Sequence, residues 1–130
     1  MTTPPAGRRS EAGPLEYVLT DGPAGIRLSG NYNTALPAPL GLAASFSREN
    51  AYNFGLVMGK EGGATNQGGL LAPMINQVSF PTAGRNFETL GEDPFVLAEL
   101  LVPQVEGMQD QGLIASLKHF TMNDFENNRM

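Results

Sequence analysis

The sequence contains no cysteine and only one histidine, His119, among its 130 residues. Without cysteine the chain has no disulfide framework, no thiolate nucleophile and no thiolate metal site. A single histidine also excludes a zinc site built from several histidines. We therefore expect a protein that works without a metal or another cofactor.

Long hydrophobic runs and basic clusters are missing too. No apolar run approaches the roughly 20 residues of a membrane-spanning helix, and the first residues lack the apolar segment of a secretory signal. The largest basic cluster is the pair Arg8-Arg9, and the formal net charge is −5. This acidic balance argues against a nucleic-acid surface. We expect a soluble, cytoplasmic protein that binds neither membrane nor nucleic acid.

The residues that are present suit one compact domain. Apolar residues make up 41% of the chain and charged residues 16%, which is too apolar for a disordered protein. The length is well below the roughly 250 residues of a complete (β/α)8 barrel. The 16 glycines and 10 prolines indicate many turns rather than a helical bundle.

Short apolar segments bounded by turn residues predict three strands. The predicted strands are 15–20, 70–75 and 113–117. Turn signals predict loops over 28–40, 62–69 and 77–90. Residues 1–14 are polar and rich in proline and glycine, so we predict a disordered leader followed by a single domain over 15–130.

Two helices are predicted between the strands. Ser47 is the expected N-cap of the first helix, which runs to Glu61. Its apolar face consists of Ala51, Phe54, Gly55 and Met58. Asp93 and Pro94 begin the second helix, which ends near Gly112. Its apolar stripe consists of Leu97, Leu101, Val105 and Met108. Pro103 lies inside this helix and is expected to kink it.

The resulting order, β-α-β-α-β, predicts an α/β fold with parallel strands and crossover helices. In such folds functional residues gather at the carboxyl ends of the strands. Asp21 follows the first strand, Arg85 lies beyond the second, and Lys118 and His119 follow the third. We therefore expect these four side chains to face the same end of the sheet.

Each candidate also has a purely structural interpretation. Asp21 is able to accept hydrogen bonds from two hydroxyls of a polyol, or to cap its own turn. Lys118 and His119 both reach one site only if the strand is already ending; otherwise one forms a salt bridge and the other packs in the core. Arg85 either pairs with Glu88 or presents its guanidinium to ligand oxygens. The polar segment 123–129 has the composition of a solvated tail.

Several segments in order resemble glycoside hydrolase family 3, the β-glucosidases and related exo-acting β-glycosidases. They are DGPAGIR, the run from LPAPLGLAASF to GGATN, LLAPMIN, GRNFETLGEDP and QGLIASLKHFTMNDFENNR. The resemblance covers roughly residues 19–129. It implies a partial TIM-barrel-like βαβαβ unit with parallel strands, either an incomplete barrel or an open sheet.

The resemblance also implies a function. Asp21, Arg85, Lys118 and His119 would bind hydroxyls of the non-reducing sugar, and Glu88 would brace its loop. The implied activity is hydrolysis of terminal non-reducing β-D-glucosyl residues. The ligand would be a glucoside or another glycoside.

The chain departs from the family pattern at three points. Ser79 stands where an R-x-P pattern usually places arginine, and Pro103 interrupts a helix that is usually uninterrupted. The family's nucleophilic aspartate lies well downstream, and its acid/base residue usually belongs to a second domain. A retaining glycosidase needs two carboxylates about 5 Å apart, so the resemblance implies a truncated barrel segment holding half of a sugar site.

Three functions stay open on these grounds. The chain is a β-glucosidase-type enzyme completed by other residues, a non-catalytic glycoside-binding module or partner subunit, or a repurposed small enzyme that uses Lys118 or His119 as acid or base. Three or four strands cannot close a barrel and leave an edge and an apolar face open. We expect a homo-oligomer or a complementing chain to cover them, unless the chain forms a small three-layer sheet of its own.

Overall fold

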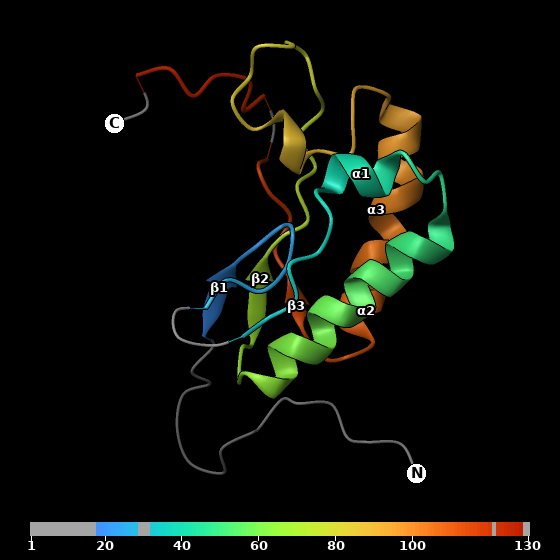
Figure 1. The fold of residues 1–130 in the computed structure, drawn as a ribbon, viewed down its shortest axis with the longest axis vertical. Helices are drawn as coiled ribbons and strands as arrows, with labels where there is room; N and C mark the ends of the chain where they lie inside the picture. Colours follow the sequence, from blue (N-terminus) through green and yellow to red (C-terminus); the bar gives the residue numbers. More distant parts are fainter. Residues whose placement is uncertain (1–17, 29–31, 121, 129–130) are drawn as a thin grey trace.

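The computed structural model describes residues 18–28, 32–120 and 122–128; the predicted leader lies outside them. Three parallel strands form an open sheet in the order β1-β2-β3 (Figure 1). The strands are β1 (Leu19–Asp21), β2 (Gly69–Leu71) and β3 (Ile114–Ala115). The predicted α/β fold with parallel strands is confirmed.

The second and third strands are shorter than the sequence predicts. The second strand was expected over 70–75, but β2 ends before Ala72 and Pro73. Proline has no N–H to donate to a neighbouring strand, so the regular ladder stops there. Pairing beyond it is limited to an isolated bridge between Met74 and Lys118. The third strand shrinks from 113–117 to two residues. The first strand was expected over 15–20, of which 15–17 lie outside the described residues. It extends to Asp21, which was expected in a turn.

Helix α2 (Arg48–Ala64) begins at the predicted N-cap. The side chain of Ser47 accepts a hydrogen bond of 3.1 Å from the N–H of Asn50. The helix continues three residues past the expected end and includes Gly62, where a turn was predicted. A Cβ on Gly62 would lie 2.8 Å from the side chain of Leu113. Packing against this leucine therefore favours glycine within the helix, and the local turn signal was misleading.

Helix α3 (Pro94–Gln109) also begins where predicted, with the side chain of Asp93 accepting a 2.8 Å hydrogen bond from the N–H of Phe95. Its buried face differs from the expected stripe. The fully buried residues are Leu100, Gln104, Gly107 and Met108, whereas Leu97, Leu101 and Val105 are only partly buried. The helix continues through Pro103 to Gln109.

The close approach of α2 explains this shift of the buried face. A Cβ on Gly55 would lie 1.9 Å from the backbone oxygen of Gln104, and one on Gly107 would lie 2.2 Å from that of Tyr52. The backbones of α2 and α3 are therefore in direct contact at these two glycines. The larger leucines of α3 lie beside this line of contact rather than on it.

Two further elements interrupt predicted loops. Helix α1 (Pro39–Ala43) lies at the end of the segment 28–40, with Pro39 at its start and Leu42 buried. A 3-10 turn, η1 (Asn86–Glu88), lies within 77–90. The expectation of continuous loop was wrong in both places. The burial of Leu42 in the core stabilises a helix too short to be read from sequence periodicity.

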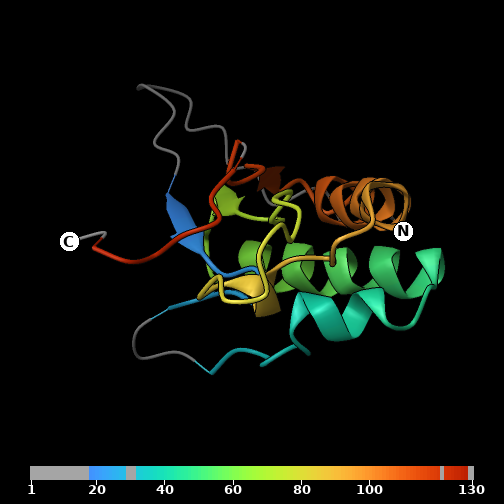
Figure 2. The same cartoon turned by 90° about the horizontal axis from the view of Figure 1, so that it is seen from above.

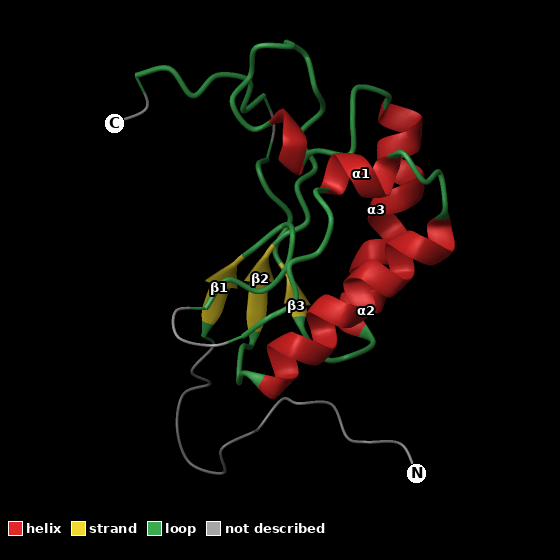
Figure 3. Cartoon of the chain, viewed as in Figure 1, coloured by secondary structure: helices red, strands yellow, loops and turns green. Residues whose placement is uncertain are grey.

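Both long helices cover the same face of the sheet (Figure 2). Leu70 is fully buried in the core. Leu19 and Ile114 pair with the preceding residue of β2, Gly69, and are 54% and 45% exposed. The described elements thus form two layers, helices and sheet, rather than three (Figure 3). An apolar face of the sheet is left open, as expected for part of a barrel.

None of the helices in the described ranges has the length and apolar character needed to cross a membrane.

Candidate functional site

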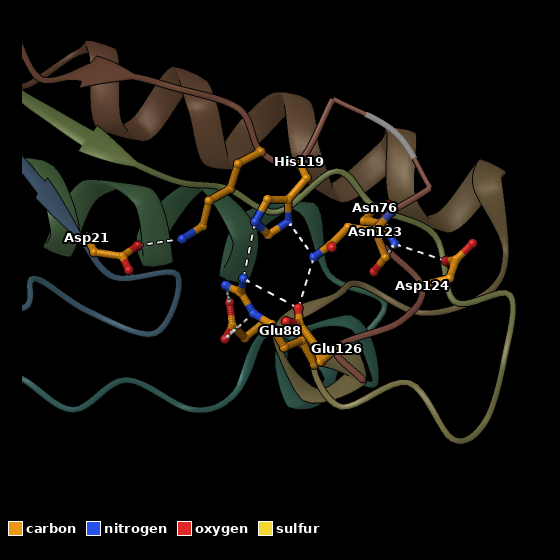
Figure 4. A network of polar contacts seen from close by, with 9 residues as sticks. Asp21, Asn76, Glu88, His119, Asn123, Asp124 and Glu126 are labelled. Atoms are coloured by element: carbon orange, nitrogen blue, oxygen red, sulfur yellow. Dashed lines mark hydrogen bonds and ion pairs between the residues drawn. The ribbon is translucent and has the colours of Figure 1, made fainter. Parts of the chain in front are cut away.

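The carboxyl ends of β1 and β3 bring Asp21 and Lys118 together. Asp21 is the last residue of β1, and the ammonium of Lys118 donates a hydrogen bond to its Oδ1 (Figure 4). The same oxygen accepts the N–H of Gly22 at 2.9 Å. The backbone N–H of Lys118 is bonded to the carbonyl of Pro73, beyond β2. The three parallel strands, with β2 between β1 and β3, therefore bring the two charges together at one end of the sheet.

The charges around Asp21 keep it ionised. Burial by itself would raise the pKa of Asp21, but the hydrogen bond and the positive charge of Lys118 outweigh it. The N–H of Gly22 and the charge of Arg85 act in the same direction, so the pKa lies below its ordinary value. The Asp21 side chain is 42% exposed and that of Lys118 16%. An ionised carboxylate with accessible surface is thus available to a ligand.

Arg85 forms a two-pronged ion pair with Glu88. Its Nε and Nη2 donate to the two carboxylate oxygens at 3.1 and 2.6 Å. The 3-10 turn η1 begins directly after Arg85 and places the two residues one turn apart. The hydrogen bond and charge of Glu88 raise the pKa of Arg85, against the effect of burial. Arg85 therefore pairs with Glu88, as one of the two sequence-based interpretations predicted. Its remaining nitrogen, Nη1, faces His119.

His119 lies between Arg85 and Asn123. Its Nε2 is 3.1 Å from Nη1 of Arg85, and its Nδ1 is 3.1 Å from the side-chain amide nitrogen of Asn123. Arginine offers only donors, so Nε2 must be the acceptor in the first contact. The peptide bond between Lys118 and His119 is cis. Because β3 ends at Ala115, strand alternation no longer applies here, and both side chains reach the site.

Residues that the sequence analysis did not assign to the site also contact this cluster. The segment 123–129 has the composition of a solvated tail, but its described part is bonded into the site. Oε1 of Glu126 lies 3.2 Å from the amide nitrogen of Asn123 and 3.8 Å from Nη1 of Arg85. Asp124 is buried and contacts Asn76. The one available signal was the density of amide and carboxylate side chains directly after Lys118 and His119.

The four predicted site residues thus lie in one cluster. Asp21 contacts Lys118, Arg85 contacts His119, and the charges of Arg85 and Asp21 influence each other. A carboxylate that accepts and cations that donate form a suitable lining for a ligand with several hydroxyls. Within the part of the chain that the structure describes, no group of three or more acidic or histidine side chains is arranged to hold a metal ion.

Sequence comparison identifies the source of this arrangement. Residues 11–126 match the glycosyl hydrolase family 3 N terminal domain. The chain belongs to glycosyl hydrolase family 3. The resemblance carried by its motifs is therefore confirmed at the level of the family.

This family 3 chain is similar to several β-glucosidases. It is 37% identical over 123 residues to β-glucosidase BoGH3A of Bacteroides ovatus, which covers 85% of the chain and 16% of the relative. It is 39% identical over 124 residues to thermostable β-glucosidase B of Acetivibrio thermocellus, covering 87% and 16%. The chain thus spans only a small part of the length of these relatives.

Solved structures of the family share the fold described above. DesR, a β-glucosidase from Streptomyces venezuelae solved in complex with D-glucose, superimposes with a TM-score of 0.84 at 47% identity. That match covers 87% of this chain and 14% of DesR. β-Glucosidase 3B from Thermotoga neapolitana, in complex with glucose, matches with a TM-score of 0.81 at 39% identity, covering 86% and 17%.

Proposed function

We propose that this chain binds the terminal non-reducing β-D-glucosyl residue of a glycoside. The observation that carries the proposal is the meeting of the Asp21–Lys118 pair with the Arg85–His119 pair at the carboxyl ends of the strands. Each glucose hydroxyl donates one hydrogen bond and accepts others. The cluster supplies both partners, since Asp21 accepts while Lys118 and Arg85 donate. Glucose bound by DesR and by β-glucosidase 3B supports this ligand class.

Hydrolysis of a β-glucoside requires catalytic residues in addition to this cluster. A retaining glycosidase requires a nucleophilic carboxylate and an acid/base carboxyl about 5 Å apart. The carboxylates of the cluster are already paired with cations: Asp21 with Lys118, and Glu88 and Glu126 with Arg85. We assign them to holding the sugar and the loop. The reacting carboxylates are then supplied from outside the described residues, by the same polypeptide or by a partner.

The open face of the sheet supports a partner of this kind. Leu19 and Ile114 are exposed on the face opposite the helices, and β1 and β3 are both edge strands of the described sheet. Unpaired edges and exposed apolar side chains favour association with further strands. A second copy of the chain or a complementing family 3 segment would bury them.

Glucose binding by the full chain tests the proposed function. D-glucose is titrated into the protein while ¹H–¹⁵N NMR spectra are recorded, for wild type and for Asp21→Asn and Lys118→Ala. Loss of a charged hydrogen bond corresponds to affinity at least about tenfold weaker. Lys60→Ala, an exposed lysine on α2, is the matched control and should bind as wild type does.

Two results would overturn the proposal. One is the absence of any saturable response of the folded wild-type protein to glucose or to an aryl β-glucoside. The other is equal affinity in wild type and both site variants. Hydrolysis of a chromogenic β-glucoside, measured alongside, shows separately whether the reacting carboxylates are present.

A further inference from the structure

We infer that Asn76 is a positioning residue for the proposed sugar site, because it holds the segment 123–126 against the loop that carries Arg85. The inference rests on the proposed function, since its consequence is tighter sugar binding. Asn76 lies on the side of His119 remote from Asp21 (Figure 4). It therefore acts through the residues that it holds.

Asn76 uses both ends of its side-chain amide to hold this segment. Its oxygen accepts the backbone N–H of Asn123 at 2.8 Å. Its nitrogen donates to Oδ1 of Asp124 at 3.3 Å and lies 3.4 Å from the carbonyl oxygen of Asn123. A further contact of 3.1 Å to the carbonyl oxygen of Gln77 fixes the orientation of the amide. One side chain thus joins two segments that belong to no helix or strand of the described structure.

Burial makes the contact between Asn76 and Asp124 selective. Asn76 is 4% exposed and Asp124 is 7% exposed. An amide beside a carboxylate is complementary, since the amide N–H donates and the carboxylate accepts. Two carboxylates in the same place would repel each other, with little water to screen the charges. The segment 123–126 is therefore held only while one of the two positions carries a donor.

The segment also packs against the loop 77–90 between Asn76 and Arg85. The rings of Phe80 and Phe125 have centroids 5.1 Å apart. A Cβ on Gly84 would lie 3.4 Å from Cγ of Glu126, so these two residues lie close together. The contacts thus follow the loop from Asn76 to the residue directly before Arg85.

At the end of these contacts the carboxylate of Glu126 faces the guanidinium of Arg85. Nε and Nη2 of Arg85 donate to Glu88, and Nη1 lies 3.1 Å from Nε2 of His119. Oε1 of Glu126 is 3.8 Å from Nη1. At this distance the carboxylate attracts Nη1 without taking its proton in a hydrogen bond. A sugar hydroxyl is then able to accept the second N–H of an Nη1 that is already oriented.

Preorganisation connects the buried amide of Asn76 to binding. While the segment is held, the guanidinium of Arg85 does not have to be ordered when the sugar arrives. Once the contacts of Asn76 are broken, Glu126 is free to move away from Arg85, and ordering both side chains opposes binding. Glucose affinity should therefore depend on the contact between Asn76 and Asp124, although both residues are buried.

Exchanging the two side chains tests this dependence with the full chain. Asn76→Asp places a second carboxylate against Asp124. The double variant Asn76→Asp/Asp124→Asn again has one carboxylate and one amide, with their positions exchanged. The introduced carboxylate still accepts the backbone N–H of Asn123. Asn127→Asp adds the same charge at an exposed position of the neighbouring chain and is the matched control.

D-glucose titrations followed by ¹H–¹⁵N NMR give the affinities, and thermal unfolding shows that each variant is folded. We expect Asn76→Asp to bind glucose about three- to tenfold more weakly, the range for loss of one ordinary hydrogen bond. The double variant should return to within about twofold of wild type, since neighbouring substitutions are not additive. Asn127→Asp should bind as wild type does. If Asn76→Asp does not fold, Asn76→Ala removes the same contacts without adding a charge and takes its place.

Wild-type affinity in the folded variant at position 76 would overturn the inference, because the site would then not need Asn76. An equal loss in Asn76→Asp and in the double variant would overturn it as well, since recovery requires the restored contact with position 124. If wild type does not bind glucose, the proposed function fails and this inference fails with it. The failures are distinguishable, because the last is seen in wild type alone and the other two require a wild type that binds.

Discussion

Asp21 and Lys118 form an ion pair across the ends of β1 and β3, although 97 residues separate them in the sequence. Parallel strands make this possible, because their carboxyl ends meet at one edge of the sheet. The pair joins the first and last strands of the described fold. It also supplies a carboxylate and an ammonium to the candidate sugar site, so stability and binding are linked through the same two residues.

This pair predicts a specific dependence of stability on pH. The pKa of Asp21 is lower in the folded protein than its ordinary value of 3.8. The stabilisation is therefore fully present above the unfolded-state pKa and is lost as the pH falls below 3.8 through the folded-state pKa. Urea unfolding at a series of pH values should show a steeper acid loss in wild type than in Asp21→Asn. Parallel curves for the two proteins would contradict the prediction.

The contact between α2 and α3 predicts that alanine is not tolerated at Gly55. Its Cβ would lie 1.9 Å from the backbone oxygen of Gln104, so a helix must move. We expect Gly55→Ala to reduce the free energy of unfolding by about 1–3 kcal/mol or more, measured by urea unfolding. Gly41→Ala in α1 is the control, because its Cβ would meet only Pro37, at 3.9 Å. Equal stability of Gly55→Ala and wild type would show that the helices are not in this contact.

A buried amide on α3 predicts a stabilising substitution. Gln104 is 1% exposed, and among the described residues neither atom of its amide group has a hydrogen-bond partner. An unsatisfied buried polar group costs about 1–3 kcal/mol, and methionine has a similar shape. Gln104→Met should therefore raise the midpoint of thermal unfolding. Gln109→Met, at an exposed position of the same helix, should leave it nearly unchanged. Destabilisation by Gln104→Met would indicate that the amide has a partner in the folded protein.

The open face of the sheet predicts association through apolar side chains. If a second copy covers this face, light scattering after size-exclusion chromatography should give a mass above that of a 13.8 kDa monomer. Ile114→Lys should then shift the protein toward the monomer. Val102→Lys changes an exposed apolar residue of α3 (56% exposed, against 45% for Ile114) and should not. If the wild type is a monomer, a second copy does not cover the open face. A complementing chain or a longer polypeptide would then have to cover it.

Local signals were sufficient for much of the fold. Ser47 and Asp93 are caps whose hydrogen bonds involve residues two or three positions away, so the starts of both long helices were predictable. The order of strands and helices also follows from apolar segments and turn residues. Placing Asp21, Arg85, Lys118 and His119 at one end of the sheet required only this order and the geometry of parallel strands.

Long-range contacts decided the rest. The buried face of α3 follows from glycines of α2, which are distant in the sequence, and α1 exists because Leu42 reaches the core. The link between Asn76 and Asn123 spans 47 residues and uses no repeating pattern. Sequence alone thus indicated the family, the order of the main elements and four residues that lie at the carboxyl ends of the strands. The tertiary structure decided which of them touch, because those contacts depend on the distance between segments that no local signal encodes.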